Sequence, residues 1–373
     1  MRFRHLTPSS RIRITPYSEL IDAQGATSFT SYNNTLLATS FKSVNEVYWH
    51  LRRHVQLWDV SCEKQVEIVG VDAARLVQLM TPRDLSRAEV GQCLYVPLVD
   101  DSGGLINDPI VLKLAEDRFW LSISDSDVLL WAKGLAIGFS LDVLVFEPDV
   151  CPLAVQGPKA ETLMALLFGD GVSELKHFQF SFFEFKGYPL LIARSGWRKQ
   201  GGFEIYLDNI ELAGILWESL WQCGEPLEVQ AGCPNLIERL EGGLLSYGSD
   251  FNNRDNPLEC RFEKYCDIDN VSTFIGRESL IKQRDVGITR RLMGVSFSGD
   301  PCLPLEKRLG VFDGSFPIGY VTSAVWSPSL KNNIGFVMIN KSHWDIGTDV
   351  KIEVAGGREE GCIKDPPFLV PPL

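Results

Sequence analysis

Residues 103–112 read GGLINDPIVL, a turn followed by an apolar run that is interrupted by a carboxylate. The two glycines let the chain turn sharply, and the apolar residues that follow predict a β-strand over DPIVLKLA (108–115), with Asp108 at its edge. An Asp at the edge of a strand is most often a solvated turn residue. Periodicity alone therefore leaves two interpretations of Asp108, a turn residue or a side chain aimed at a ligand.

The chain around this stretch has 373 residues and ordinary globular composition, 45% hydrophobic and 23% charged. Its net charge of −12 argues against a broad nucleic-acid surface but is compatible with a local basic pocket. Nine cysteines without a CxxC pair predict free thiols in a reducing compartment. Because there is no apolar run of about 18 residues and no secretory h-region, we expect a cytoplasmic protein that does not contact a membrane.

Several stretches predict helices and strands in an α+β arrangement. LAVQGPKAETLMALLFG (153–169) fits a strand, a turn and a helix, and FQFSFFEFKGYPLLIAR (178–194) fits a β-hairpin that turns at Lys186-Gly187. PNLIERLEGGLL (234–245) has helical spacing, with Pro234 in the first turn. The first 30 residues show little periodicity, which predicts an arm or extended lead-in. From about residue 290, short strands with glycine turns predict a small all-β module.

The common catalytic signatures for nucleotide, zinc-protease and serine-hydrolase sites are absent from the sequence. His50 and His54 lie four residues apart on a predicted helix, but two histidines without a third ligand do not indicate a metal site. Glu204 alternates with Phe203 and Ile205, so it faces either solvent or a pocket. The charges at Arg239 and Glu241 are either an internal pair or surface residues.

Taken together, the motifs occur in an order that resembles one family. WDVS (58–61), TPRDLS (81–86), GGLINDPIVL, LAVQGPKA (153–160) and RSGWRKQGGFE (194–204) are followed by ERLEGGLLSYGSD (238–250), FIGRESL (274–280) and IGYVTSAVWSPSL (318–330). This order is similar to the folate-dependent aminomethyltransferase family, whose founding member is the T-protein of the glycine cleavage system. The resemblance covers about residues 30–370.

Longer unbroken stretches resemble one branch of that family, the dimethylsulfoniopropionate demethylases. They include VQLWDVSCEKQVEI and AGCPNLIERLEGGLLSYG. The T-protein pattern has DD where this chain has Asn107-Asp108, RTGYTGEDGFE at 194–204, and an arginine in place of Asn235. These departures argue against aminomethyl-lipoyl chemistry.

The resemblance implies a three-domain clover-leaf α+β fold with mixed and antiparallel sheets. It implies a folate-binding region of two discontinuous α+β subdomains at 1–285 and a C-terminal β-barrel domain at 286–373. It also implies a catalytic role for Asp108 and a pterin-binding role for Glu204. The full set of predicted site residues is Tyr95, Asp108, Ile110, Phe178 and Glu204 for the folate, and Tyr32, Trp197 and Tyr206 for the substrate.

The implied reaction is methyl transfer from a dimethylsulfonio group to N5 of tetrahydrofolate, with no metal. We expect a small sulfonium substrate and tetrahydrofolate as partners, no nucleic acid or membrane, and a homodimer as one option. Two alternatives stay open. One is a T-protein-like aminomethyltransferase or N-methyl amine demethylase on the same fold. The other is a non-catalytic folate-binding protein, whose KGCYxGQ-like signature this chain lacks.

Overall fold

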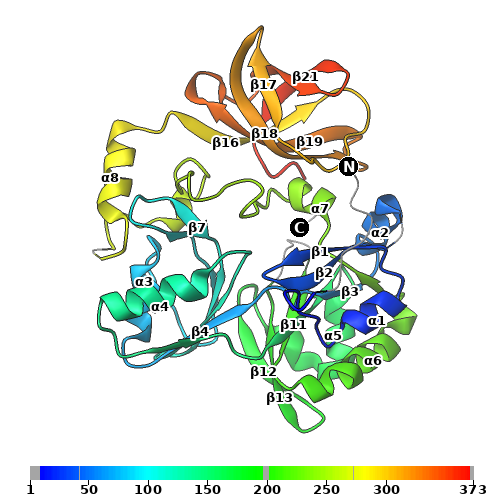
Figure 1. The fold of residues 1–373 in the computed structure, drawn as a ribbon. Coiled ribbons are helices and arrows are strands. Elements are labelled where there is room, and N and C mark those ends of the chain that lie inside the picture. The colour runs from blue at the N-terminus through cyan, green and yellow to red at the C-terminus, as the bar shows by residue number, and fades with distance from the viewer. Residues whose placement is uncertain (1–8, 42, 196–200, 272, 370–373) are drawn as a thin grey trace. The chain divides into compact units, whose positions relative to one another are not determined.

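The computed structural model describes residues 9–41, 43–195, 201–271 and 273–369 (Figure 1). They divide into two compact units. The first unit takes residues 9–76, 88–95 and 109–235, and the second takes 77–87, 96–108 and 236–369. Asp108 is the last residue of a segment of the second unit, and Pro109 begins the next segment of the first.

A six-stranded sheet is the largest β-element of the first unit. Its order is β12-β13-β14-β11-β3-β15, antiparallel except for β15, which runs parallel to β3. The strands are β3 (Gln56–Asp59), β11 (Cys151–Gln156), β12 (Phe180–Phe185), β13 (Tyr188–Ala193), β14 (Gly202–Leu207) and β15 (Gln230–Gly232).

One face of this sheet packs against helices α5 (Ala160–Phe168) and α6 (Ala213–Gly224). Their apolar residues form one buried cluster with alternate residues of the strands, such as Val155 and Phe203. Ile21 of α1 (Ser18–Ala23) and Val47 of α2 (Val44–Leu51) join the same cluster. Burial of this cluster therefore fixes which residues of β11 and β14 are left for the opposite face.

A five-stranded antiparallel sheet, in the order β10-β4-β9-β8-β5, is the second β-element of the first unit. Its strands are β4 (Gln65–Val69), β5 (Cys93–Tyr95), β8 (Ile110–Ala115), β9 (Arg118–Ser122) and β10 (Leu144–Phe146). The unit also contains the hairpin of β1 (Ser28–Tyr32) and β2 (Thr35–Ser40), and helix α4 (Val128–Gly138). Helix α3 (Ala73–Leu79) carries the chain into the second unit.

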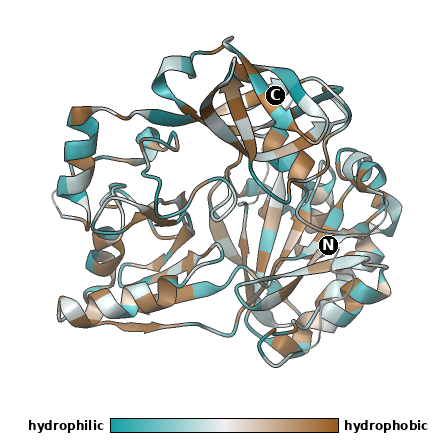
Figure 2. Ribbon diagram, turned by 45° about the horizontal axis from the view of Figure 1, so that its top comes forward, coloured by the Kyte–Doolittle hydropathy of each residue, from teal (hydrophilic) through white to brown (hydrophobic). Residues whose placement is uncertain are grey.

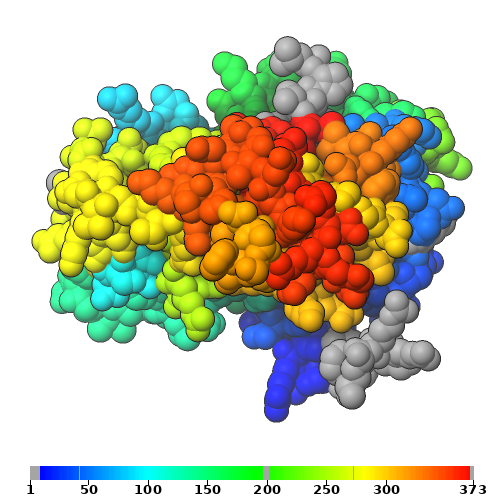
Figure 3. All heavy atoms as spheres, turned by 90° about the horizontal axis from the view of Figure 1, so that it is seen from above, coloured from blue at the N-terminus to red at the C-terminus, as the bar shows by residue number. Residues whose placement is uncertain are grey.

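The second unit contains a closed barrel in the order β16-β19-β18-β17-β20-β21. Its strands are β16 (Arg290–Phe297), β17 (Leu309–Asp313), β18 (Phe316–Ser327), β19 (Asn332–Asn340), β20 (Asp349–Val354) and β21 (Gly357–Lys364). Apolar and polar residues alternate along several of them (Figure 2), and Val295, Val337 and Ile352 are among those that fill the interior. The outer surface of the barrel is orange to red in Figure 3. The unit also contains the strand pair β6 (Leu98–Val99) and β7 (Leu105–Asn107) and helices α7 (Leu236–Glu241) and α8 (Arg277–Val286).

The expected fold class, an α+β chain ending in a small barrel, is confirmed by these sheets and by the closed barrel. The hairpin turn is confirmed as well, since Lys186 and Gly187 both have positive φ, 54° and 81°. Two local expectations were wrong. The lead-in contains helix α1, and α7 begins at Leu236, so Pro234 precedes the helix. The boundary predicted at 285/286 lies just before β16 and stays a prediction.

Candidate active site

The six-stranded sheet of the first unit has a second face, opposite the one that packs on α5 and α6. Strand register identifies it, because residues paired across an antiparallel sheet point to the same side. Glu204 pairs with Ala154 and Ala193, Tyr206 with Pro152 and Leu191, and Gly202 with Gln156. We call this the polar face and define it by Gln56, Trp58, Ala154, Gln156, Ala193, Gly202, Glu204 and Tyr206.

Glu204 is the carboxylate of the polar face, and it is buried, with 7% of its surface exposed. Its Oε2 accepts hydrogen bonds from Ser195 Oγ at 2.6 Å and from Tyr206 Oη at 2.9 Å. Burial raises the pKa of this carboxyl, and the two hydroxyl bonds lower it by less. Among the described residues, the hydroxyls of Ser195 and Tyr206 both donate to Oε2, so Oε1 can accept a hydrogen bond from a ligand. The sequence left two interpretations of Glu204, exposure to solvent or a place in a pocket, and its burial excludes exposure to solvent.

Ser195 is a site residue that the sequence analysis missed. It lies two residues beyond Ala193, the cross-strand partner of Glu204, and only 2% of its surface is exposed. The sequence could have indicated this residue, because Leu191, Ala193 and Ser195 are alternate residues, and alternate residues of an extended chain point to the same face as one another. What the sequence could not show is that β13 pairs with β14 in the register that brings the hydroxyl to Glu204.

Tyr206 links Glu204 to an apolar cluster of the first unit. Its ring is 6.0 Å from that of Trp120, measured between centroids, and its hydroxyl is the one bound to Glu204. The cluster also contains two of the predicted folate residues, Ile110 and Phe178. Tyr95, a third, is the register partner of Ile110. The first unit thus brings Glu204, Tyr206, Ile110 and Phe178 into one neighbourhood, with Tyr95 beside it.

Phe178 has an unusual backbone, with φ at +62°, a value that aromatic residues seldom adopt. Two hydrogen bonds and one ring contact explain how it is held there. Its N–H donates to the carbonyl of Arg194 at 2.9 Å, its carbonyl accepts from the N–H of Cys93 at 2.8 Å, and its ring packs edge-on against His177. Phe178 is therefore fixed between the strand ends of both sheets of the first unit.

Asp108 lies in the second unit, directly after β7. It is 8% exposed, and its N–H donates to the side-chain oxygen of Asn107 at 3.0 Å. Asn107 is itself fully buried and pairs with Leu98 across β6 and β7. Burial raises the pKa of Tyr247, and the negative charge of Asp108 adds to that shift. The interpretation of Asp108 as a solvated turn residue is therefore wrong.

Two predicted substrate residues are placed less fully. Tyr32 is half-buried at the end of β1, where it pairs with Thr35 of β2. Trp197 lies outside the described residues, so its role stays a prediction from the sequence.

The charges of α7 belong to the interior of the second unit. Arg239 forms an ion pair with Asp250, and its side chain also donates to Ser323 Oγ at 2.9 Å. Glu241 is 2% exposed and accepts a bond of 2.6 Å from Ser327 Oγ. Both residues are therefore internal, but each is bound to a different partner.

His50 and His54 do not share a helix, because α2 ends at Leu51. Their rings are nevertheless 4.9 Å apart. His50 Nε2 is 2.8 Å from the carbonyl oxygen of Glu228, and His54 Nδ1 is 3.0 Å from Lys159 Nζ. These contacts join α2 and the turn that follows it to the residues before α5 and β15, which is a structural role.

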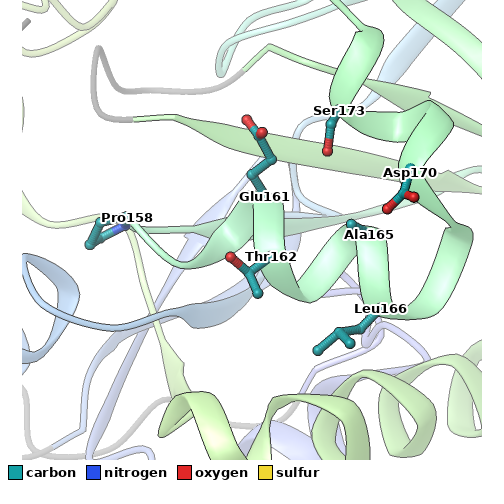
Figure 4. A pocket seen from close by; sticks show the side chains of 7 residues that line it. All are labelled: Pro158, Glu161, Thr162, Ala165, Leu166, Asp170 and Ser173. Carbon is teal, nitrogen blue, oxygen red and sulfur yellow. The ribbon is translucent and has the colours of Figure 1, made fainter.

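A shallow hollow lies over α5, lined by Pro158, Glu161, Thr162, Ala165, Leu166, Asp170 and Ser173 (Figure 4). In Figure 4, Glu161 and Ser173 lie in the upper part of the view and Leu166 lies below them. The predicted site residues that the structure describes do not line this hollow. Among the described residues, no helix is long and apolar enough to cross a membrane.

Two family models match the chain. They are the GCVT N-terminal domain over residues 18–270 and the glycine cleavage T-protein C-terminal barrel domain over residues 290–369. The chain is 44% identical over 360 residues to dimethylsulfoniopropionate demethylase DmdA of Ruegeria pomeroyi. This match covers 96% of this chain and 98% of that protein. It is 30% identical over 327 residues to an aminomethyltransferase of Thermoanaerobacter sp. (strain X514), covering 85% and 87% of the two chains.

Among solved structures, the chain is similar to the glycine cleavage system aminomethyltransferase T from Bartonella henselae. The TM-score is 0.85 at 25% identity, and the match covers 96% of this chain and 98% of that one. The fold expected from the resemblance is thereby confirmed.

Proposed function

The chain belongs to the glycine cleavage T-protein family, and on that premise we propose that it is a tetrahydrofolate-dependent methyltransferase that demethylates dimethylsulfoniopropionate. The products are 5-methyltetrahydrofolate and methylmercaptopropionate. The observation that carries the choice of methyl donor is the 44% identity, over 96% of the chain, to a demethylase of that compound. The 30% identity to an aminomethyltransferase supports the family and not the donor.

The residues of the polar face fit a folate. A pterin ring presents neighbouring N–H donors, and a buried carboxylate binds such donors through short charge-assisted hydrogen bonds. Glu204 has the required form, because Ser195 and Tyr206 hold its Oε2 and fix the orientation of Oε1. The nearby Ile110 and Phe178 supply apolar surface for a flat ring.

When bound, tetrahydrofolate supplies the N5 lone pair that forms the new N–CH3 bond while the S–CH3 bond breaks and its electron pair stays on sulfur. Asp108 is proposed to offset the positive charge that develops on N5 and to accept the N5 proton. Its burial strengthens that electrostatic effect, since a desolvated carboxylate is less screened.

The leaving group explains why no acid is needed. A thioether departs as a neutral molecule, so no side chain has to protonate it. The protein instead has to align donor and acceptor and to shield a cation from water. Aromatic faces contribute about 0.5–2 kcal/mol to holding such a cation. Tyr32, Trp197 and Tyr206 are the proposed aromatic residues.

The proposed location is the cytoplasm. All nine cysteines are free, which fits a reducing compartment. A homodimer remains a prediction that sedimentation of the purified protein would test.

The test is a direct assay. Purified protein is incubated with tetrahydrofolate and dimethylsulfoniopropionate, and 5-methyltetrahydrofolate and methylmercaptopropionate are quantified, with glycine betaine and dimethylglycine as competing donors. We expect product from the sulfonium compound. Product from dimethylglycine alone would replace this function with an amine demethylase.

The role of Asp108 is tested by Asp108→Asn, with Asp101→Asn as the matched control because Asp101 is exposed in the neighbouring turn. We expect Asp108→Asn to lose most of the turnover without a change in melting temperature, and Asp101→Asn to keep it. Near-normal turnover in Asp108→Asn would remove the proposed role.

A further inference from the structure

Gln156 is a buried polar residue that the proposed mechanism does not yet use. It is the last residue of β11, and 1% of its surface is exposed. Within the described part of the chain, no donor lies within hydrogen-bond distance of its Oε1. A buried acceptor without a donor costs about 1–3 kcal/mol of stability. Such a group is rare in folded proteins and calls for an explanation.

The neighbouring Gln56 is a buried glutamine whose side-chain amide does have hydrogen-bond partners. Gln56 is the cross-strand partner of Gln156 on β3 and is equally buried. Its Nε2 donates to the carbonyl of Val47 at 3.1 Å, and its Oε1 accepts from Trp58 Nε1 at 2.9 Å. The sheet can therefore provide partners for a buried amide, and it provides none for Oε1 of Gln156.

Gln156 lies beside Glu204 on the polar face. Its partner on β14 is Gly202, and Glu204 is two residues further along the same strand. Such diagonal neighbours are separated by about 7–8 Å between Cα atoms, within reach of long side chains. At Gly202 the face carries no side chain, and a Cβ there would lie 2.4 Å from Gln156 Oε1. The glycine thus lets the amide lie against the strand that bears Glu204.

We propose that Gln156 is a second ligand-binding residue of the polar face, whose Oε1 accepts an N–H of the folate's pterin ring next to the donors bound by Glu204. This inference rests on the proposed function, because it takes the ligand to be a folate. Among the described residues of the free protein this acceptor has no donor, and the ligand supplies one. The stability lost in the free protein is then recovered as affinity.

The two roles of a buried glutamine, packing and ligand binding, predict different results for Gln156→Met. Methionine has similar length and no polar group that requires a partner. A packing role predicts an equal or higher melting temperature and unchanged folate binding. The proposal predicts the same melting temperature effect together with about a tenfold higher Kd for tetrahydrofolate, measured by anaerobic titration calorimetry.

The matched control is Tyr17→Phe. Tyr17 Oη is also buried without a partner in the described structure, but Tyr17 belongs to the apolar cluster on the opposite face of the same sheet. This variant should shift the melting temperature upward and leave the Kd for tetrahydrofolate unchanged. A second probe, p-aminobenzoylglutamate, lacks the pterin ring, so Gln156→Met should bind it as the wild type does.

Gly202→Ala provides an independent variant, since it displaces the amide of Gln156 without removing it. Binding is measured at a temperature where circular dichroism shows both variants folded, and both should weaken tetrahydrofolate binding. Affinity within twofold of the wild type in both variants would overturn the inference. Failure of the proposed function is a separate result, because the wild type itself would then show no binding or turnover with tetrahydrofolate.

Discussion

The ion pair of Arg239 and Asp250 offers the sharpest stability prediction for the second unit. The side chains are 5% and 0% exposed, so neither charge can be solvated when the other is removed. Asp250 accepts from Arg239 and the N–H of Ser246 through Oδ2, and from Thr322 and Ser323 at 2.8 and 2.6 Å through Oδ1. Asp250→Ala would leave a buried guanidinium without its carboxylate partner and would remove one acceptor from three neutral donors.

Removing one partner of such a pair costs about 3–5 kcal/mol, which is a large part of the roughly 5–15 kcal/mol that stabilises a typical domain. Replacing both partners by apolar residues should cost much less, because no buried charge remains. We therefore expect Asp250→Ala to lower the free energy of unfolding strongly, and the double variant Arg239→Met with Asp250→Ala to lower it by less than the sum of the two single changes Arg239→Met and Asp250→Ala.

Equilibrium urea denaturation of the wild type, the two single variants and the double variant gives the required cycle. The control is Lys351→Ala in the barrel, because Lys351 forms an exposed pair with Glu360 at 3.1 Å, and such pairs contribute about 0–1 kcal/mol. A loss below about 1 kcal/mol for Asp250→Ala, or strict additivity in the cycle, would refute the reasoning about this buried pair.

Three further predictions concern the first unit and the thiols. Burial raises the pKa of Glu204, so the folded state keeps this proton to a higher pH than the unfolded chain does, and the stability this gives is lost as pH rises through the folded pKa. The melting temperature of Glu204→Gln should therefore exceed that of the wild type by an amount that grows from pH 5 to pH 8, while folate binding weakens. A constant difference in melting temperature would contradict this. Tyr206→Phe removes one of two donors to Glu204 Oε2 and should raise the folate Kd about two- to tenfold, as titration calorimetry can measure. Burial raises the pKa of Cys233 to about 12 and that of Cys266 to about 12, so iodoacetamide at pH 8 should leave both unlabelled in the native protein and label both in urea, as mass spectrometry of peptides would show.

Features with a local physical cause were predictable from the sequence. Lys186-Gly187 specifies a tight hairpin because that turn needs two residues with positive φ. Several C-terminal strands were predictable because glycine turns mark their ends: Gly314 lies between β17 and β18, and Gly356 lies between β20 and β21. The ordered motifs predicted the family and its fold, and both are now shown.

Other features depend on partners that are distant in the sequence, and only the tertiary structure decided them. Periodicity placed Glu204 opposite Phe203 but could not choose between solvent and a pocket; the pairing of β14 with β11 and β13 chose burial. Arg239 found its partner in Asp250 and on the barrel rather than in Glu241.

Asp108 shows most clearly which properties the sequence determined and which properties only the tertiary structure decided. The sequence by itself determined that a carboxylate stands at the edge of a predicted strand, and the family resemblance gave it a proposed role. Its burial was decided by the tertiary structure, in which the fully buried Asn107 pairs with Leu98 and the Asp108 N–H binds the Asn107 side chain. The reason is physical: alternation records which side chains share a face of a strand, whereas burial depends on what packs against that face.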